Sequence, residues 1–163
     1  MDKVFGVDDS IKSYVLLGVL VTSAISSPLS GWIADRIGFK KTLMGILAGW
    51  IVIFPILAFT QSLPSLFVVT VLMGFLFGSV WTVTRAMVTH LTPPQSLNQS
   101  YTYFTFMERF ATFVGPVSWG LIVAWAPQAD SFNYRSAALA MTIFIVIGLV
   151  ILRKMPKMAP AVS

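Results

Sequence analysis

The chain has 163 residues and a formal net charge of +5, and it is 56% hydrophobic with only 10% charged residues. Ordinary globular domains have about 45–50% apolar and about 25% charged residues, and a soluble protein of this length cannot bury so much apolar surface. This composition excludes an ordinary soluble domain and predicts a protein embedded in the lipid bilayer. The positive charge does not indicate nucleic-acid binding, because the basic residues flank the ends of apolar runs instead of forming one stripe.

Long uncharged runs, separated by short charged or proline-containing segments, predict five membrane-spanning helices. A helix that crosses the hydrocarbon core needs about 20 residues, and apolar runs without alternation favour helices over strands. Helices also satisfy their own backbone hydrogen bonds, as a segment in lipid must. In chain order we expect helices at about 12–34, 42–60, 64–91, 99–126 and 134–152. The predicted fold class is all-α, a polytopic transmembrane bundle in which residues 1–163 form a single domain.

A short charged segment, residues 31–43, joins the first two predicted helices. Asp35 is expected to close the first helix, and its carboxylate can accept hydrogen bonds from N–H groups at the N-terminus of another helix. Gly38 permits a tight turn with a positive φ angle. Lys40 and Lys41 are expected to anchor to anionic lipid headgroups. The alternative interpretation is a positively charged loop such as any membrane protein has.

Three charged residues lie within the third and fourth predicted helices, where the bilayer makes them costly. Each charge costs about 2.5–3.5 kcal/mol at a helix centre, whereas one Leu, Ile, Phe or Val returns only about 0.3–0.6 kcal/mol. At the α-helical rise, Arg85 lies about 9 Å from the end of its helix, and Glu108 lies about 10–14 Å from the end of the next. These similar depths predict that the two side chains can pair. Arg109 directly follows Glu108 and points about 100° away from it, so both cannot face one partner.

Basic residues are unevenly distributed between the two sides of the predicted bundle. Six of them fall on the side of the 31–43 segment and the C-terminal tail: Arg36, Lys40, Lys41, Arg153, Lys154 and Lys157. The other side carries Lys3, Lys12 and Arg135 together with four aspartates. Because cytoplasmic loops carry an excess of Lys and Arg, we expect the 31–43 segment and the C-terminus in the cytoplasm and the N-terminus outside.

No metal site, cofactor or enzymatic site is expected. The chain has no cysteine, and its one histidine, His90, has no cysteine or carboxylate at ligand spacing. The sequence has no glycine-rich phosphate-binding loop. Nothing in it resembles a nucleophile–base pair, a metal triad or a carboxylate dyad. An intramembrane enzyme is therefore the least favoured class of function.

The 31–43 segment resembles the signature loop of the major facilitator superfamily, which has the pattern Gly-x-x-x-Asp-Arg-x-Gly-x-Lys-x-x-Leu. The matching residues are Gly31, Asp35, Arg36, Gly38, Lys40 and Leu43. In that family the loop joins the second and third helices of each six-helix half and helps to lock the two halves in one conformation. The resemblance implies that the matching residues, with Lys41, form a conformational latch. Phe39 departs from the family pattern, which usually has a second basic residue there, and this weakens the electrostatic part of the latch.

Residues 79–122 further resemble the vacuole-effluxer-like branch of this family, which includes autophagy-related permeases. The matching segments are Thr84-Arg85-Ala86, Leu91-Thr92-Pro93, Ser100-Tyr101-Thr102-Tyr103-Phe104 and the stretch from Arg109 to Gly115-Pro116. The resemblance implies that the five helices correspond to helices eight to twelve of a twelve-helix transporter. The expected location is a bacterial plasma membrane. The chain is then a partial fold that needs the missing N-terminal half or a partner chain.

The family resemblance implies part of a secondary active transporter that moves a small solute, such as an amino acid or a similar metabolite, by alternating access. Arg85, Glu108 and Arg109 are candidate charges of its transport path, because ionisable residues inside a membrane are functional candidates by default. If Glu108 titrates, it couples proton entry to transport. The alternative for both arginines is snorkelling, in which a long side chain reaches the membrane surface.

Gly115 and Pro116 form a candidate flexure of the fourth helix, because proline removes a backbone hydrogen bond and can kink a helix. Ordinary helix packing is the alternative for this pair. The expected partners of the chain are the bilayer, a small-molecule substrate and the remainder of the transporter fold. Two alternatives to transport remain: a non-transporting membrane subunit and a truncated relic of the same fold.

Overall fold

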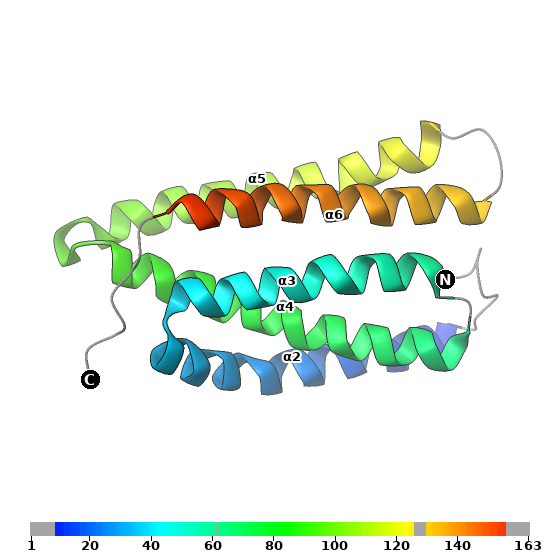
Figure 1. Ribbon diagram of the computed structural model, residues 1–163, viewed down its shortest axis with the longest axis horizontal. Coiled ribbons are helices and arrows are strands. Elements are labelled where there is room, and N and C mark those ends of the chain that lie inside the picture. Colours follow the sequence, from blue (N-terminus) through cyan, green and yellow to red (C-terminus); the bar gives the residue numbers. More distant parts are fainter. Residues whose placement is uncertain (1–8, 61, 126–129, 156–163) are drawn as a thin grey trace.

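The computed structural model describes residues 9–60, 62–125 and 130–155, and in these residues it contains helices and no strand. The elements are α2 (Asp9–Ile37), α3 (Phe39–Phe59), α4 (Leu63–Leu91), the short 3-10 helix η1 (Pro94–Ser96), α5 (Leu97–Trp125) and α6 (Asp130–Lys154). Figure 1 shows the long helices side by side, with α2, α3 and α4 on one side of the bundle and α5 and α6 on the other. This arrangement confirms the predicted all-α helical bundle.

Four helices are long and apolar enough to cross a membrane: Ser13–Ile37, Phe39–Phe59, Leu63–Leu91 and Arg135–Lys154. The fifth long helix, α5, has 29 residues but is not among them. Its first half is rich in polar side chains and contains Glu108 and Arg109, which lower its mean hydropathy. Length and composition therefore support four of the five expected crossings, and α5 needs polar surroundings or a partner for its charges.

The closest helix packing joins α2 and α4. A Cβ atom added at Gly78 would lie 2.2 Å from the backbone oxygen of Ser23, and one at Gly74 would lie 2.7 Å from that of Val19. The two backbones therefore touch directly, as small residues permit in membrane proteins. Ser27 and Thr82 add a hydrogen bond between the hydroxyl groups of the two helices.

Helices α3 and α6 form the second extensive contact, whereas α4 and α5 meet at only a few points. At one end of the bundle the apolar core contains residues of α2, α3, α4 and α6: Ala34, Phe39, Leu43, Ile46, Val83, Met87 and Leu152. The charged segment between α2 and α3 is therefore attached to this core and does not form a free loop.

Candidate transport site and hinge

Gly38 is the single residue that separates α2 from α3, and its φ angle is 95°. Its N–H group donates to the carbonyl oxygen of Ala34 at 2.9 Å, and its own carbonyl accepts from the N–H group of Thr42 at 3.1 Å. The chain thus leaves one helix and enters the next within one residue. The φ angle of Gly38 and these hydrogen bonds confirm the expected tight turn. Residues with a side chain rarely adopt this backbone conformation.

Phe39, which occupies the position where the family pattern has a basic residue, is only 3% exposed. Its ring stacks on His90 of α4 with 4.4 Å between ring centroids. It also belongs to the apolar core that includes Met87 of α4 and Leu152 of α6. The departure from the family pattern therefore gives the hinge a hydrophobic anchor in place of a charge.

Lys40 does not behave as a simple headgroup anchor. Its Nζ atom donates to the carbonyl oxygen of Arg153 at 3.0 Å and also to that of Met155. One of these carbonyls lies in the last turn of α6 and the other directly after it, where backbone acceptors lack partners within the helix. Lys40 therefore ties the hinge to the C-terminal end of α6, whereas Lys41 is exposed and its anchoring to headgroups stays a prediction.

The two charged residues before the turn, Asp35 and Arg36, lie at the surface of the described part of the chain. The guanidinium carbon of Arg36 lies 3.8 Å from the centroid of the Trp32 ring. Asp35 is exposed, and within the described residues no hydrogen bond or ion pair is recorded for its carboxylate. A Cβ at Gly31 would meet Thr82 at an ordinary 3.7 Å, so the closest approach of α2 to α4 occurs elsewhere, at Gly74 and Gly78.

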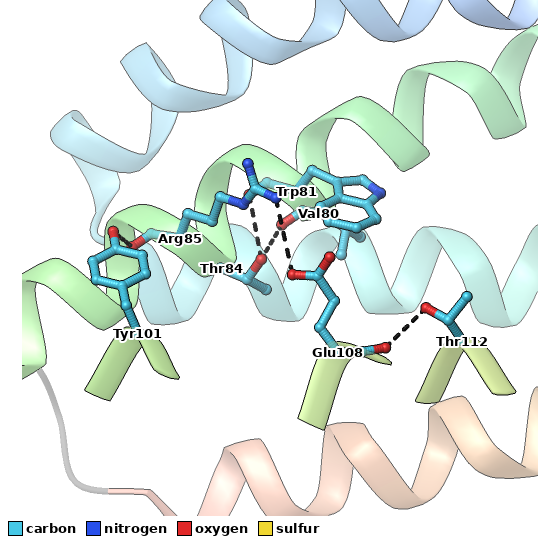
Figure 2. Close-up of polar contacts among 7 residues, drawn as sticks. All are labelled: Val80, Trp81, Thr84, Arg85, Tyr101, Glu108 and Thr112. Carbon is cyan, nitrogen blue, oxygen red and sulfur yellow. Dashed lines mark hydrogen bonds and ion pairs between the residues drawn. The ribbon is translucent and has the colours of Figure 1, made fainter. Parts of the chain in front are cut away.

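Arg85 of α4 and Glu108 of α5 lie across from each other, as their depths in the sequence predicted. Arg85 Nη2 is 3.9 Å from Glu108 Oε2, and the two side chains are 56% and 19% exposed. Figure 2 shows the guanidinium reaching over Thr84 towards the carboxylate. Because α4 and α5 have few other contacts, this pair is one of the main links between the two helices.

Aromatic groups position the arginine of this pair (Figure 2). The Arg85 guanidinium carbon lies 5.0 Å from the centroid of the Trp81 ring, within the range of a cation–π interaction. Tyr101 of α5 donates from Oη to the Arg85 carbonyl oxygen at 3.1 Å, and it shares a 2.7 Å hydrogen bond with the Thr89 hydroxyl. Sequence reasoning missed both aromatic partners. The spacing of four residues between Trp81 and Arg85 was the available signal.

Arg109 and the Gly115-Pro116 step are not drawn into this cluster. Arg109 is exposed, and no ion pair is recorded for it within the described part of the chain. Helix α5 continues through Pro116, and a Cβ at Gly115 would meet nothing within 4 Å. No group of three or more potential metal ligands occurs among residues 9–60, 62–125 and 130–155.

Comparison with known proteins supports the family expected from the hinge. The model of the major facilitator superfamily matches residues 1–162. The fatty acid resistance protein FarB of Neisseria gonorrhoeae is 26% identical over 68% of this chain and 22% of its own length. MdtD of Pectobacterium atrosepticum, a protein named for multidrug resistance, is 26% identical over 69% of this chain and 24% of its own. The multidrug export protein EmrB of Haemophilus influenzae is 24% identical over 72% of this chain and 23% of its own length.

These matches cover about a quarter of the length of the curated relatives. The relatives are bacterial proteins named for resistance and export, so they give no support to the vacuole-effluxer-like branch. Their names and their family are those of transporters and not of enzymes. Together with the apolar helices and the hinge at Gly38, the family match identifies an integral membrane protein. The chain belongs to the major facilitator superfamily.

Proposed function

We propose that this chain is part of a secondary transporter that moves a small solute across a bacterial membrane by alternating access. The observation that carries the proposal is the contact of Arg85 with Glu108 between two membrane-length helices. A charge within lipid is costly, so such residues are retained where they face a partner or a wet path. In this family's mechanism two parts of the protein rock around a site near the middle of the membrane, and a charge pair between helices suits that site.

Glu108 is the proposed proton-coupling group. Its carboxylate is largely covered by the chain, whereas the Arg85 guanidinium is more than half exposed. Protonation of Glu108 removes the charge that holds Arg85 and weakens the link between α4 and α5. Because the pair is one of the few contacts between α4 and α5, its loss allows the two helices to separate during the transport cycle.

The hinge residues from Gly31 to Lys41 are the proposed latch. Gly38 fixes the angle between α2 and α3, and Asp35 and Arg36 remain accessible at the surface of this chain. These two charges are available to a further part of the transporter, either from the same protein or from a partner chain. In the proposed topology the hinge and the C-terminus are cytoplasmic and the N-terminus is outside, as the distribution of basic residues favours.

The names of two relatives bear on the class of substrate. FarB is named for resistance to fatty acids and EmrB for multidrug export. These names favour an amphipathic solute over the amino acid that the sequence resemblance implied. The branch of the family also remains a prediction.

The test is transport by proteoliposomes that contain this chain together with the rest of the transporter fold, encoded in one reading frame or co-expressed. A pH-sensitive dye inside the vesicles records proton movement when laurate, a lipophilic drug or an amino acid is added, and the signal of protein-free vesicles is subtracted because un-ionised laurate crosses lipid by itself. We expect Glu108→Gln to abolish substrate-dependent proton movement. Arg153→Gln removes a charge of equal size and opposite sign at the exposed end of α6, and we expect it to leave the movement intact. Full proton-coupled transport by Glu108→Gln refutes the role of this residue. If this chain copurifies with another transporter, and the transport rate of that protein is the same with and without this chain, the alternative of a non-transporting subunit is supported.

A further inference from the structure

We propose that Arg85 and the aromatic face of α4 next to it bind a single-chain anionic amphiphile, with the guanidinium on the carboxylate and the aromatic rings on the hydrocarbon chain. The inference rests on the proposed transport function and names the substrate class of the same site. Three features of the described residues support it: the unequal exposure of the charge pair, the aromatic strip on α4 and the balance of charge around it.

The first feature is that the arginine of the pair is accessible and the glutamate is not. Arg85 is 56% exposed and Glu108 only 19%. Their closest atoms are 3.9 Å apart, which is longer than the 2.7–3.2 Å of a hydrogen bond. A guanidinium carries five N–H donors in a fork that fits a carboxylate. A ligand that approaches this site therefore meets uncovered donors of Arg85 before it meets Glu108.

The second feature is an aromatic strip that ends at this guanidinium. Phe77, Trp81 and Arg85 follow one another at intervals of four residues, which places them on one face of α4. The Phe77 and Trp81 rings meet edge to face with centroids 6.0 Å apart, and Trp81 continues the strip to Arg85. Phe77 is 50% exposed, so this chain leaves the strip accessible. At the α-helical rise the strip is about 12 Å long from Phe77 to Arg85.

The third feature is the sign of the charge. Glu108 is the one acidic residue of α4 and α5, whereas Arg85 and Arg109 are both cations. An organic cation would be repelled by the exposed Arg85, while a carboxylate is attracted and competes with Glu108 for it. Removal of the Glu108 charge therefore frees the guanidinium and strengthens the binding of an anion. This competition joins proton uptake to substrate binding at one pair of residues.

The experiment uses the chain in nanodiscs of phosphatidylcholine with a laurate analogue that carries a photoreactive diazirine. We expect labelling on α4 between Phe77 and Arg85, which unlabelled laurate reduces and dodecyltrimethylammonium or dodecanol does not. Arg85→Gln is expected to weaken binding at least about tenfold, because a charged hydrogen bond is lost. Glu108→Gln is expected to tighten binding about two- to fivefold, the range of a partly exposed ion pair. Misfolding exposes apolar surface throughout the chain and would spread the labelling, so a gain that stays confined to α4 is not explained by misfolding.

Arg36→Gln is the matched control, because Arg36 also stacks on a tryptophan four residues earlier but lies at the hinge. It is expected to bind laurate as the unchanged chain does. Weaker binding by Glu108→Gln, or an equal loss in Arg36→Gln and Arg85→Gln, overturns the inference.

Preferential binding of the cation through Glu108 overturns the anionic substrate but leaves the proposed transporter standing. Loss of labelling in phosphatidylglycerol nanodiscs shows a lipid headgroup site instead. Binding as expected without coupled transport refutes the proposed function alone.

Discussion

Replacing Gly78 by alanine tests the direct backbone contact between α2 and α4. The added Cβ would lie 2.2 Å from the Ser23 carbonyl oxygen, 2.5 Å from Ser26 Oγ and 2.7 Å from Ser23 Oγ. The serine hydroxyls can rotate, but the carbonyl oxygen belongs to the backbone of α2. The helices must therefore move apart, which loosens the packing along the whole seam. We expect a destabilised protein that keeps its helices.

The magnitude follows from two opposing effects. Inserting a methyl group into a packed interior costs about 1–3 kcal/mol, and the upper end applies because a backbone atom blocks the site. Alanine is more favourable than glycine within a helix by about 1 kcal/mol. The expected net loss is about 2 kcal/mol, which corresponds to a decrease in Tm of about 4–8 °C for a protein of this size.

Gly45→Ala is the control, because a Cβ at Gly45 would meet nothing within 4 Å. It makes the same chemical change in α3 and is expected to raise the stability by up to about 1 kcal/mol. Thermal unfolding followed by the fluorescence of the five tryptophans in detergent, with reversible SDS titration as a second measurement, compares the two variants. Equal stability of Gly78→Ala and Gly45→Ala would refute the close packing of α2 on α4.

Three further predictions concern the hinge. Gly38→Ala places a side chain at a φ of 95° and is expected to destabilise the protein by about 1–3 kcal/mol; an unchanged Tm contradicts the turn. Phe39→Ala empties a buried site and is expected to cost about 3–5 kcal/mol, measured by SDS titration, whereas a loss below 1 kcal/mol excludes a core role. Lys40→Met is expected to accelerate amide hydrogen exchange in the last turn of α6, whereas Lys41→Met is expected to leave it unchanged. Equal exchange rates of these amides in the two variants argue against the contact of Lys40 with α6.

The fold was predictable from the distribution of charge along the chain. Uncharged runs of membrane length indicated the helices. The similar depths of Arg85 and Glu108 in their helices indicated that the two side chains pair. The turn at Gly38 was also predictable, because glycine adopts a positive φ without strain. Only the two charges of α5 entered the prediction, although hydroxyl and amide side chains also make the first half of this helix polar.

The contacts of Phe39 and Lys40 were not predictable from local sequence. Lys40 binds carbonyl oxygens 113 and 115 residues away, and one sequence does not show which helix ends meet. The sequence shows that Phe39 replaces a basic residue of the family pattern, but it does not show that the ring is buried. Its burial depends on how α4 and α6 pack against α3, which is a property of the tertiary structure.

The attachment of Lys40 to carbonyl oxygens at and just after the end of α6 has a practical consequence for protein engineering. A truncation before Met155, or a rigid tag fused there, removes or displaces an acceptor of the Lys40 ammonium group. Such an alteration at the end of the last helix would disturb the turn between the first two helices described here. Reporter fusions that map topology should therefore be joined through a flexible spacer placed after Met155.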